Sequence, residues 1–208
     1  MNILIVDDHD IVRDGLKQLL LRKFPDAVFG EGQNAQEALD RVNQGQWDVI
    51  LLDITMPGQS GLDVLKQIKT IQPETKVLML TMHPEKQYAV RVLKTGASGY
   101  LTKETASEQV VNAVTKVLGG GTYISETFAQ SLASSLGAPE TTPHETLSDR
   151  EYQVMRKIAA GKSGKEIAYE LSLSVKTVST YRARVLKKLN VKTNAEVIRY
   201  AMREKLVD

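Results

Sequence analysis

Four short apolar runs, each followed by a polar residue, constrain the fold of this chain more than any other feature. Short runs that are apolar throughout are typical of strands buried on both faces, as in parallel sheets. The carboxyl ends of parallel strands meet at one edge, where open α/β sheets bind their ligands, so we expect the polar residues to lie together. The runs and the residues that close them are Ile3–Val6 with Asp7 and Asp8, Val49–Leu52 with Asp53, Val77–Leu80 with Thr81, and Gly99–Thr102 with Lys103.

Helical patterns separate these runs. The four residues Thr105–Glu108 have the form of a capping box, which predicts that a helix opens there and carries its apolar face as far as Val117. Five strand–helix units of this size predict an α/β domain with a doubly wound, five-stranded parallel sheet. The other expected elements are helices over 11–20, 34–42, 62–68 and 88–93, and a weak strand over 28–30.

The last part of the chain has an all-helical pattern. Gly119-Gly120-Gly121 stops the preceding helix, since glycine is poor inside helices and common after them. A short helix is expected within 122–135, and 137–143 has the composition of a linker. Three further capping boxes then predict a small four-helix domain; they are Ser148 with Glu151, Ser163 with Glu166, and Thr193 with Glu196.

These patterns predict one α/β domain over residues 1–118, a linker over 119–146 and an all-α domain over 147–208. Charge divides the chain in the same way. Residues 1–143 carry 13 Lys and Arg against 17 Asp and Glu, a net charge of −4, whereas residues 144–208 carry 14 against 8, a net charge of +6. A compact basic domain suits a polyanion such as nucleic acid, although a merely solvated basic surface is an alternative.

Composition excludes several other classes of protein. The chain has no cysteine, which removes disulfides, thiol catalysis and cysteine metal sites. Its start does not have the form of a signal peptide. No apolar stretch approaches the ~20 residues that span a bilayer. We therefore expect a soluble, cytoplasmic protein with no membrane partner.

The acidic group at the expected sheet edge has a definite chemistry. Three carboxylates held close together need a cation, and Mg²⁺ prefers oxygen ligands and often bridges carboxylates to phosphate oxygens. In that setting a carboxylate such as Asp53 can attack a phosphoryl group and form an aspartyl-phosphate. The ammonium of Lys103 would neutralise the phosphoryl oxygens, and the Thr81 hydroxyl could donate a hydrogen bond to them.

Each of these residues also has an ordinary structural interpretation. An aspartate at a strand end more often caps a turn or a helix, so Asp7, Asp8 or Asp10 could cap the helix that starts near Ile11. Lys103 could be a solvated surface lysine. The coincidence of all of them at the ends of four strands favours the functional interpretation.

Residues 1 to about 118 resemble the receiver domain of bacterial two-component response regulators, which has the flavodoxin-like fold of CheY. The resemblance rests on Asp7-Asp8 after the first strand, Asp53 followed by Met56-Pro57-Gly58, Thr81 after the fourth strand, and Lys103-Glu104 after the fifth. The family usually has proline where this chain has Glu104, which removes a common aid to a cis peptide bond after Lys103.

The resemblance implies a role for each matching residue. Asp53 is expected to accept a phosphoryl group from a sensor histidine kinase, with Lys103 in contact with that group. Thr81 and Tyr100 are expected to form a switch pair. The implied ligands of Mg²⁺ are Asp8 and Asp53 directly, Asp7 through water, and the main-chain carbonyl of Thr55.

An independent enzyme is the main alternative from another class. Phosphatases with an aspartate nucleophile also use Mg²⁺ and an α/β sheet, but they place a second carboxylate two residues after the nucleophile. Thr55 occupies that position here, and a threonine does not readily exchange protons near neutral pH. We therefore expect no independent enzyme, but only self-dephosphorylation at a rate that depends on Thr55 and His83.

The basic domain has the pattern of a helix-turn-helix. A short amphipathic helix over 165–171 is followed by a tight connection over 172–174 and a longer helix over 175–189, which is apolar on one side and basic on the other. Ser174 is a good N-cap for that longer helix. A small helical bundle that binds a protein partner is the alternative interpretation.

Residues 147–208 resemble the LuxR-type DNA-binding domain of NarL/FixJ-class response regulators. The resemblance covers the whole domain and rests on 147–151, 161–168 and 173–178, with Gly164 where the family usually has asparagine. By this resemblance the last helix, expected from Ala195 to about Leu206, contributes to dimer contacts. The residues expected to face the major groove are Thr177, Ser179, Thr180 and Ala183; those expected at phosphates are Arg182, Arg184, Lys187 and Lys188, and Lys176 or Arg182 is expected to add specificity.

Together these features predict a DNA-binding transcription factor that is switched by phosphorylation of Asp53 and forms a homodimer on activation. Its partners would be a sensor histidine kinase and double-stranded DNA. The alternative within the same class is a phosphorylation-independent DNA-binding regulator whose receiver serves only for dimerisation. A phosphorelay shuttle is a further alternative, which the complete helix-turn-helix disfavours.

Overall fold

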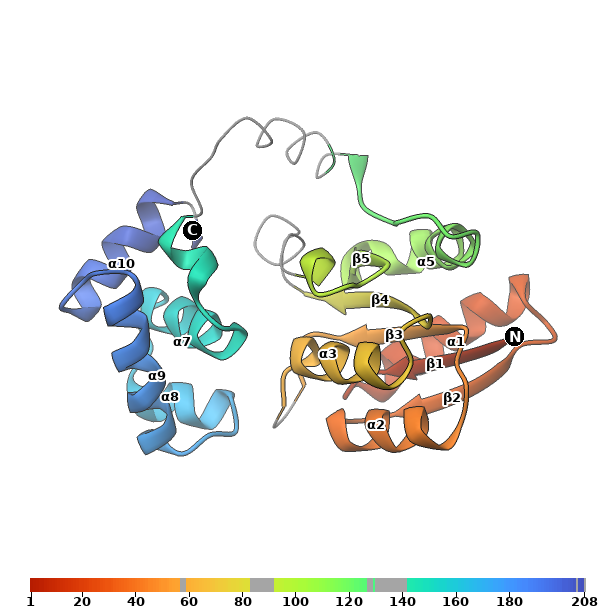
Figure 1. Cartoon of the computed structure of the whole chain (residues 1–208), viewed down its shortest axis with the longest axis horizontal. Coiled ribbons are helices and arrows are strands. Elements are labelled where there is room, and N and C mark those ends of the chain that lie inside the picture. Colours follow the sequence, from red (N-terminus) through yellow and green to blue (C-terminus); the bar gives the residue numbers. More distant parts are fainter. Residues whose placement is uncertain (57–58, 83–91, 127–128, 130–141, 205, 208) are drawn as a thin grey trace. The chain divides into compact units, whose positions relative to one another are not determined.

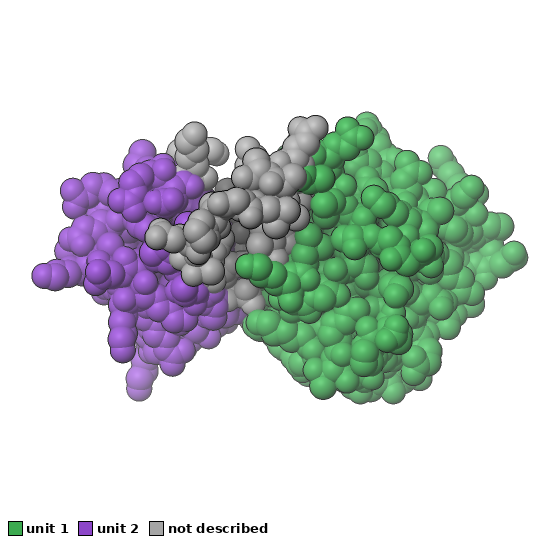
Figure 2. All heavy atoms as spheres, turned by 45° about the horizontal axis from the view of Figure 1, so that its top comes forward, with its two compact units in different colours: residues 1–136 green, residues 137–208 purple. Residues whose placement is uncertain are grey.

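The structure is a computed structural model of the chain and describes residues 1–208 except 57–58, 83–91, 127–128, 130–141, 205 and 208. The chain divides into two compact units, residues 1–136 and 137–208, which Figure 2 draws in green and purple. The predicted helix over 88–93 and the predicted helix within 122–135 lie largely outside the described residues.

The first unit is built on a parallel sheet of five strands in the order β2-β1-β3-β4-β5 (Figure 1). The chain leaves β1 to one side, for β2, and returns past it to β3, so the order reverses next to β1. This is the doubly wound α/β topology that the apolar runs predicted. The strands are β1 Asn2–Val6, β2 Val28–Gly32, β3 Val49–Asp53, β4 Lys76–Thr81 and β5 Gly99–Thr102.

Helices cover the sheet because its strands are apolar on both faces. Alternate strand residues such as Ile3, Leu51 and Leu80 pack with the inner faces of α1 and α5 in one core cluster. The helices α2 and α3 pack against each other. The described helices of this unit are α1 Asp10–Lys23, α2 Ala35–Gln44, α3 Gly61–Ile71 and α5 Lys103–Leu118.

The start of α5 differs from the sequence prediction. The helix begins at Lys103 with Thr102 as N-cap, so the predicted capping box at Thr105–Glu108 is wrong. Strand β5 runs directly into the helix without a loop, which places Thr105 inside the first turn, where its hydroxyl lies 2.9 Å from that of Thr102. The Lys103–Glu104 peptide bond is trans, as are the other described peptide bonds.

The segment after α5 returns to the sheet. Tyr123 forms an isolated parallel bridge with Gly99 at the edge of β5. The first residues of the segment predicted as a linker, 119–146, are therefore attached to the first unit.

The single tryptophan, Trp47, lies over the outer part of the sheet. Its ring packs directly on Gly30 of β2, where an added Cβ would come within 2.2 Å of the ring. Its Nε1 donates a hydrogen bond to the Arg41 carbonyl at 2.9 Å. A side chain at position 30 would displace the Trp47 ring, because the ring occupies that space.

The second unit is all α-helical, as predicted. Two of its helices begin with complete capping boxes, from Ser148 with Glu151 and from Ser163 with Glu166. At Thr193 only half of the predicted box forms, because Glu196 accepts from the amide of Lys192. The elements are a 3₁₀ turn η1 Pro143–Thr146 and helices α7 Asp149–Ala159, α8 Gly164–Glu170, α9 Val175–Lys188 and α10 Asn194–Arg203.

The core of this unit lies where α7, α9 and α10 meet. Tyr152, Met155, Val185 and Val197 are almost fully buried there. Helix α10 ends at Arg203, three residues before the predicted end. Among the described residues no helix is long and apolar enough to cross a membrane.

Candidate functional site

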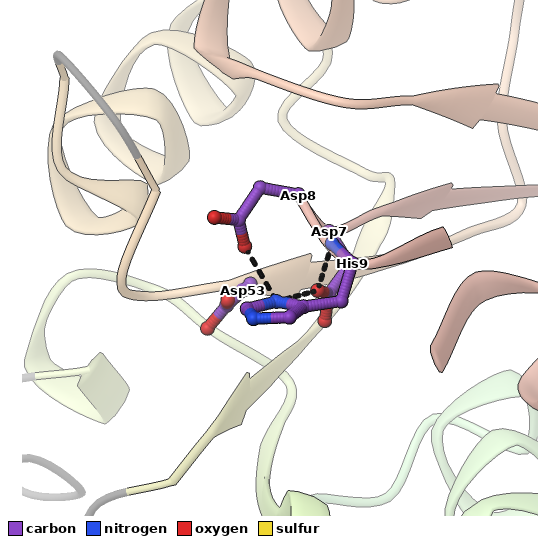
Figure 3. A group of neighbouring side chains, drawn as sticks. All are labelled: Asp7, Asp8, His9 and Asp53. Atoms are coloured by element: carbon purple, nitrogen blue, oxygen red, sulfur yellow. Dashed lines mark hydrogen bonds and ion pairs between the residues drawn. The ribbon is translucent and has the colours of Figure 1, made fainter. Parts of the chain in front are cut away.

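Carboxylates from two strand ends meet at the carboxyl edge of the sheet. Asp7 and Asp8 follow β1, and Asp53 ends β3, the strand hydrogen-bonded to β1. Figure 3 shows their side chains converging, together with that of His9. Ligand atoms of these four residues all lie within 4.8 Å of one another. A set of oxygen atoms at this spacing fits a divalent cation.

Burial and hydrogen bonding make the Asp53 carboxyl unusual. Asp53 is only 2% exposed, and its Oδ1 accepts a hydrogen bond from the Thr55 amide at 3.1 Å. Burial raises its pKa to about 6, although Lys103 and the Thr55 amide act in the opposite direction. The neighbouring carboxylate of Asp7 contributes to this rise.

One lysine joins the two buried carboxylates. The Nζ of Lys103 lies 2.8 Å from Asp53 Oδ2 and 2.7 Å from Asp7 Oδ2. Burial alone would lower the pKa of Lys103, but the attraction of Asp53 and Asp7 outweighs it, so the pKa is raised and the ammonium stays charged. Its side chain is 9% exposed, so the alternative of a solvated surface lysine is wrong.

Thr81 and Tyr100 occupy the neighbouring strands. Thr81 ends β4 and pairs in register with Thr102 of β5, and its side chain is completely buried. Tyr100 lies in β5 and is also completely buried. The strands thus bring four of the predicted residues, Asp7, Asp8, Asp53 and Lys103, into contact distance, with Thr81 and Tyr100 on the next strands.

None of the aspartates near the start of α1 is its N-cap residue. Helix α1 has His9 as its N-cap, without a side-chain cap hydrogen bond, and Asp10 is inside the first turn. Asp7 Oδ1 does accept a hydrogen bond from the His9 amide at 2.9 Å. Asp7 therefore shapes the turn before the helix while its other oxygen pairs with Lys103.

Two residues at this site were missed by the sequence analysis. His9 Nδ1 lies 2.8 Å from Asp8 Oδ1 and 3.1 Å from Asp7 Oδ1. Arg13 is buried on α1 and donates to the Asp7 carbonyl at 2.7 Å. The only signals for them are a polar residue next to an aspartate pair and a basic residue on an apolar helix face, which are too common to single out.

The second unit presents a basic helix. The outer face of α9 forms a shallow surface hollow whose lining residues are Lys176, Ser179, Thr180, Ala183, Arg184 and Lys187. Its opposite face buries Val178 and Val185. The helix is held at its start by Ser174, whose Oγ accepts from the Thr177 amide at 3.0 Å.

Two of the predicted phosphate contacts have partners inside the protein. The Nζ of Lys188 lies 2.6 Å from Glu151 Oε2 and 3.0 Å from the Thr146 carbonyl. Arg182 Nε donates to Asn194 Oδ1 at 2.6 Å. Both side chains therefore join α9 to other parts of the unit.

The first unit has a parallel sheet with a buried aspartate–lysine pair at its carboxyl edge, and the second unit is a basic helix-turn-helix. This arrangement is typical of two-domain signalling regulators. Known families match both parts. The model of the response regulator receiver domain matches residues 3–115, and that of the bacterial regulatory proteins of the luxR family matches residues 145–201. The chain belongs to the NarL/FixJ class of two-component response regulators.

Individual relatives extend over the whole chain. The response regulator UvrY of Escherichia coli K12 is 38% identical, over 99% of this chain and 95% of that protein. The oxygen regulatory protein NreC of Staphylococcus carnosus is 38% identical over the full length of both. Among solved structures, RcsB from Salmonella enterica serovar Typhimurium bound to promoter rprA with the phosphomimetic BeF₃⁻ has a TM-score of 0.65 at 25% identity, covering 96% of this chain and 97% of that one.

Proposed function

We propose that this response regulator is a DNA-binding transcription factor switched by phosphorylation of Asp53 by a sensor histidine kinase. The observation that carries the proposal is the buried Asp53 carboxylate with Lys103 Nζ at 2.8 Å. The matches to the response regulator receiver domain and to the luxR family of bacterial regulatory proteins support the same conclusion. Because DNA is the proposed target, we place its action in the cytoplasm.

The proposed transfer uses the Asp53 carboxylate as nucleophile. A carboxylate oxygen forms a bond to phosphorus while the bond from phosphorus to the kinase histidine nitrogen breaks, and that nitrogen keeps the electron pair. Lys103 neutralises the phosphoryl oxygens, and the Thr55 amide orients the carboxylate through its hydrogen bond to Oδ1.

The acidic pocket fits Mg²⁺, which supplies, when bound, positive charge beside the phosphoryl oxygens. The oxygen donors within 4.8 Å of one another support this assignment. We propose Asp8 and Asp53 as direct ligands, Asp7 as a ligand through water, and the Thr55 carbonyl as a main-chain ligand.

We further propose that Thr81 and Tyr100 read the state of Asp53. Thr81 ends β4, the strand that pairs with β3 next to Asp53, and we propose that its hydroxyl donates a hydrogen bond to the phosphoryl group. The Tyr100 side chain, which is completely buried in the structure, would then rotate. Thr55 offers no second carboxylate for turnover, so we propose that the protein is a regulator and not an enzyme.

The proposed DNA-binding surface is the outer face of α9. It carries Lys176, Arg184 and Lys187 around the short side chains of Ser179, Thr180 and Ala183, with Thr177 in the first turn. Short side chains cannot make the bidentate contacts that read bases best, so we expect specificity to depend on DNA shape and half-site spacing. We keep Arg182 as a candidate contact but assign Lys188 to the internal pair with Glu151.

Activation is proposed to produce a homodimer on DNA, with α10 among the contacting elements. We take residues 1–118 as the receiver, 119–146 as the linker and 147–208 as the DNA-binding domain. The promoter complex of the relative RcsB supports the expectation that this chain also binds double-stranded DNA.

The test is to incubate the full chain with acetyl phosphate and Mg²⁺ and to follow intact mass, light scattering and DNA binding. Asp53→Ala removes the nucleophile, and Asp40→Ala, at an exposed position of α2, is the matched control. We expect one phosphoryl adduct and a shift to dimer in the wild type and in the control, and neither in Asp53→Ala.

Two results would contradict the proposed switch. Wild-type protein that takes no adduct but binds DNA would establish the phosphorylation-independent regulator in place of the switch. An adduct that persists in Asp53→Ala would remove Asp53 as the acceptor.

A further inference from the structure

The main chain that follows α5 is hydrogen-bonded to β5, the strand that contains Tyr100. Strand β5 is the last strand of the sheet, so its outer edge would otherwise present unpaired main-chain groups. Tyr123 covers this edge. Its amide donates to the Ser98 carbonyl at 2.9 Å, and its carbonyl accepts from the Tyr100 amide at 2.9 Å. We call these two hydrogen bonds and the ring contacts of Tyr123 the Tyr123 anchor.

Side-chain contacts fix the same residue. The Tyr123 hydroxyl lies 3.0 Å from Gln109 Oε1 of α5, to which it donates. The Nζ of Lys116 lies 5.8 Å from the centre of the Tyr123 ring. The ring also packs against the core cluster beneath α5. Tyr123 is therefore attached to both the strand and the helix of the last β–α unit.

Glycines make this return possible. Gly120 adopts a positive φ of 83°, which turns the chain sharply after α5. At Gly99, an added Cβ would lie 2.6 Å from the Tyr123 carbonyl oxygen and 2.7 Å from Leu78 Cδ2. A side chain at position 99 would thus displace the main chain of Tyr123, because a carbonyl oxygen cannot move independently as the end of a side chain can.

We propose that the Tyr123 anchor couples the switch residue Tyr100 to the chain segment that leads into residues 137–208, with Tyr123 as a positioning residue. This inference rests on the proposed function. The Tyr100 amide donates a hydrogen bond to the Tyr123 carbonyl, so a shift of the β5 main chain that accompanies rotation of the Tyr100 side chain changes a contact made by the linker itself. A coupling of this kind requires a contact that differs between the two states of the switch.

The proposal requires that the Tyr123 anchor differs between the resting and the activated protein. When Asp53 carries a phosphoryl group or its mimic beryllofluoride (called loading below), the two main-chain hydrogen bonds of Tyr123 must be weakened or rearranged. Otherwise the linker would be the same in both states. The segment from Tyr123 onward would then start from a different position, which alters how residues 137–208 are presented to DNA or to a second copy.

The experiment follows amide exchange of full-length protein by NMR, with and without Mg²⁺ and beryllofluoride, and compares wild type with Gly99→Ala. The matched control is Gly45→Ala, where an added Cβ meets nothing within 4 Å. In the wild type we expect the Tyr100 and Tyr123 amides to be protected, and loading to change Tyr123 exchange by about tenfold. In Gly99→Ala we expect fast Tyr123 exchange before loading.

Function is read in parallel. Acetyl phosphate should give the same Asp53 adduct, by intact mass, in wild type, Gly99→Ala and Gly45→Ala. In the wild type and in Gly45→Ala, loading should change both the oligomeric state and the affinity for a random-sequence DNA duplex. In Gly99→Ala, both of these responses should be lost. A destabilised active site would reduce the amount of adduct. A normal adduct together with lost DNA and dimer responses therefore indicates loss of the coupling.

Two outcomes would overturn the coupling. One is a normal adduct with unchanged Tyr123 exchange on loading; the other is a Gly99→Ala protein whose DNA and dimer responses equal those of the wild type. A wild type that takes no adduct would instead refute the proposed function, and the coupling with it.

A second pair of variants removes dependence on the folding of Gly99→Ala. Tyr123→Ala deletes the ring contacts, whereas Tyr123→Phe keeps the ring and loses the hydrogen bond from the hydroxyl to Gln109. We expect Tyr123→Ala to lose the response to loading and Tyr123→Phe to restore it. Equal responses in the two variants would contradict a positioning role for the ring.

Discussion

At the scale of single residues, Lys103 is the group on which the acidic pocket depends. Its ammonium contacts both buried carboxylates, at 2.7 Å from Asp7 and 2.8 Å from Asp53. Without a cation between them, two carboxylates this close would repel each other. Lys103 therefore stabilises the pocket but also competes with any metal ion for the same oxygen atoms.

This competition gives a prediction for Lys103→Met. Removing the ammonium should raise the affinity of the pocket for Mg²⁺ by about three- to tenfold, because the carboxylates lose their fixed positive partner. The same change should slow formation of the phosphoryl adduct, since Lys103 no longer neutralises the phosphoryl oxygens. Calorimetric titration with Mg²⁺ and mass spectrometry measure the two effects.

Lys17→Met is the control, because Lys17 pairs with Glu31 at 2.7 Å and does not contact Asp53. It should leave both the Mg²⁺ affinity and the adduct rate as in the wild type. A weaker Mg²⁺ affinity in Lys103→Met would contradict the competition.

The residues of the pocket differ in how far the sequence reveals them. Asp7 and Asp53 follow apolar runs, and strand pairing then brings them together, so the pattern alone locates them. Arg13 supports the Asp7 carbonyl from the next helix. Its role depends on how α1 packs on β1, which spacing along the chain does not encode.

At the scale of elements, the second unit depends on how its helices begin. Ser174 accepts from the amide of Thr177 at 3.0 Å and its hydroxyl lies 2.8 Å from that of Thr177. This cap orders the first turn of α9, which leads into the proposed DNA-binding face. The order of that turn should therefore affect both stability and DNA affinity.

We predict that Ser174→Ala lowers the free energy of unfolding of the second unit by about 1 kcal/mol and weakens DNA binding. Ser174→Asn should retain both properties, because asparagine is an equally good N-cap. Amide exchange of the first turn of α9 and a DNA titration measure the effects. Equal behaviour of the two variants would show that the cap is not the cause.

A second element contact predicts a dependence on pH. Burial alone would raise the pKa of Glu151, but Lys188 and the Ser148 cap outweigh it, so the pKa of Glu151 in the folded protein lies below its usual value. A carboxyl with a lowered pKa contributes stability above its unfolded pKa and loses that contribution as pH falls through the folded value. The second unit should therefore lose stability as the solution is acidified below the usual range of a glutamate pKa.

Glu151→Gln isolates this contribution. It should destabilise the second unit by on the order of 1 kcal/mol near neutral pH and reduce the loss on acidification. Amide exchange of α7 and α9 at several pH values provides the measurement, with Glu204→Gln, a partly exposed glutamate that pairs with Arg203, as control. An unchanged pH dependence in Glu151→Gln would assign the acid effect to other groups.

Sequence patterns located most elements, and the exceptions have physical causes. Ser148 and Ser163 are caps because each lies between a turn and an apolar helix face. Thr105 has the same local signature, but β5 ends at Thr102, three residues earlier, and already fixes the direction of the chain, so tertiary structure overrides the local pattern. Lys188 lies in a basic helix, and only the packing of α7 against α9 reveals its partner Glu151.

At the scale of the whole molecule, charge is unevenly distributed. Residues 1–143 carry a net charge of −4 and residues 144–208 a net charge of +6. A DNA phosphate backbone is therefore attracted by one part of the chain and repelled by the other. The strength of both effects falls as salt is added.

Two adjacent lysines of α9 allow this attraction to be tested. Lys187→Ala should reduce the slope of log affinity against log salt by about 1, because Lys187 lies on the outer face of the helix. Lys188→Ala should leave the slope unchanged and instead destabilise the second unit, since its ammonium pairs with Glu151. The reverse pattern would exchange the roles of the two residues.

The position of Trp47 has a practical consequence for studying the whole molecule. The chain contains one tryptophan, and its ring is packed on Gly30 in the first unit. Intrinsic tryptophan emission of the full-length protein therefore reports on that unit alone, while ellipticity reports on helices of both. A single denaturant titration observed at the two signals can separate the two unfolding transitions without cutting the chain.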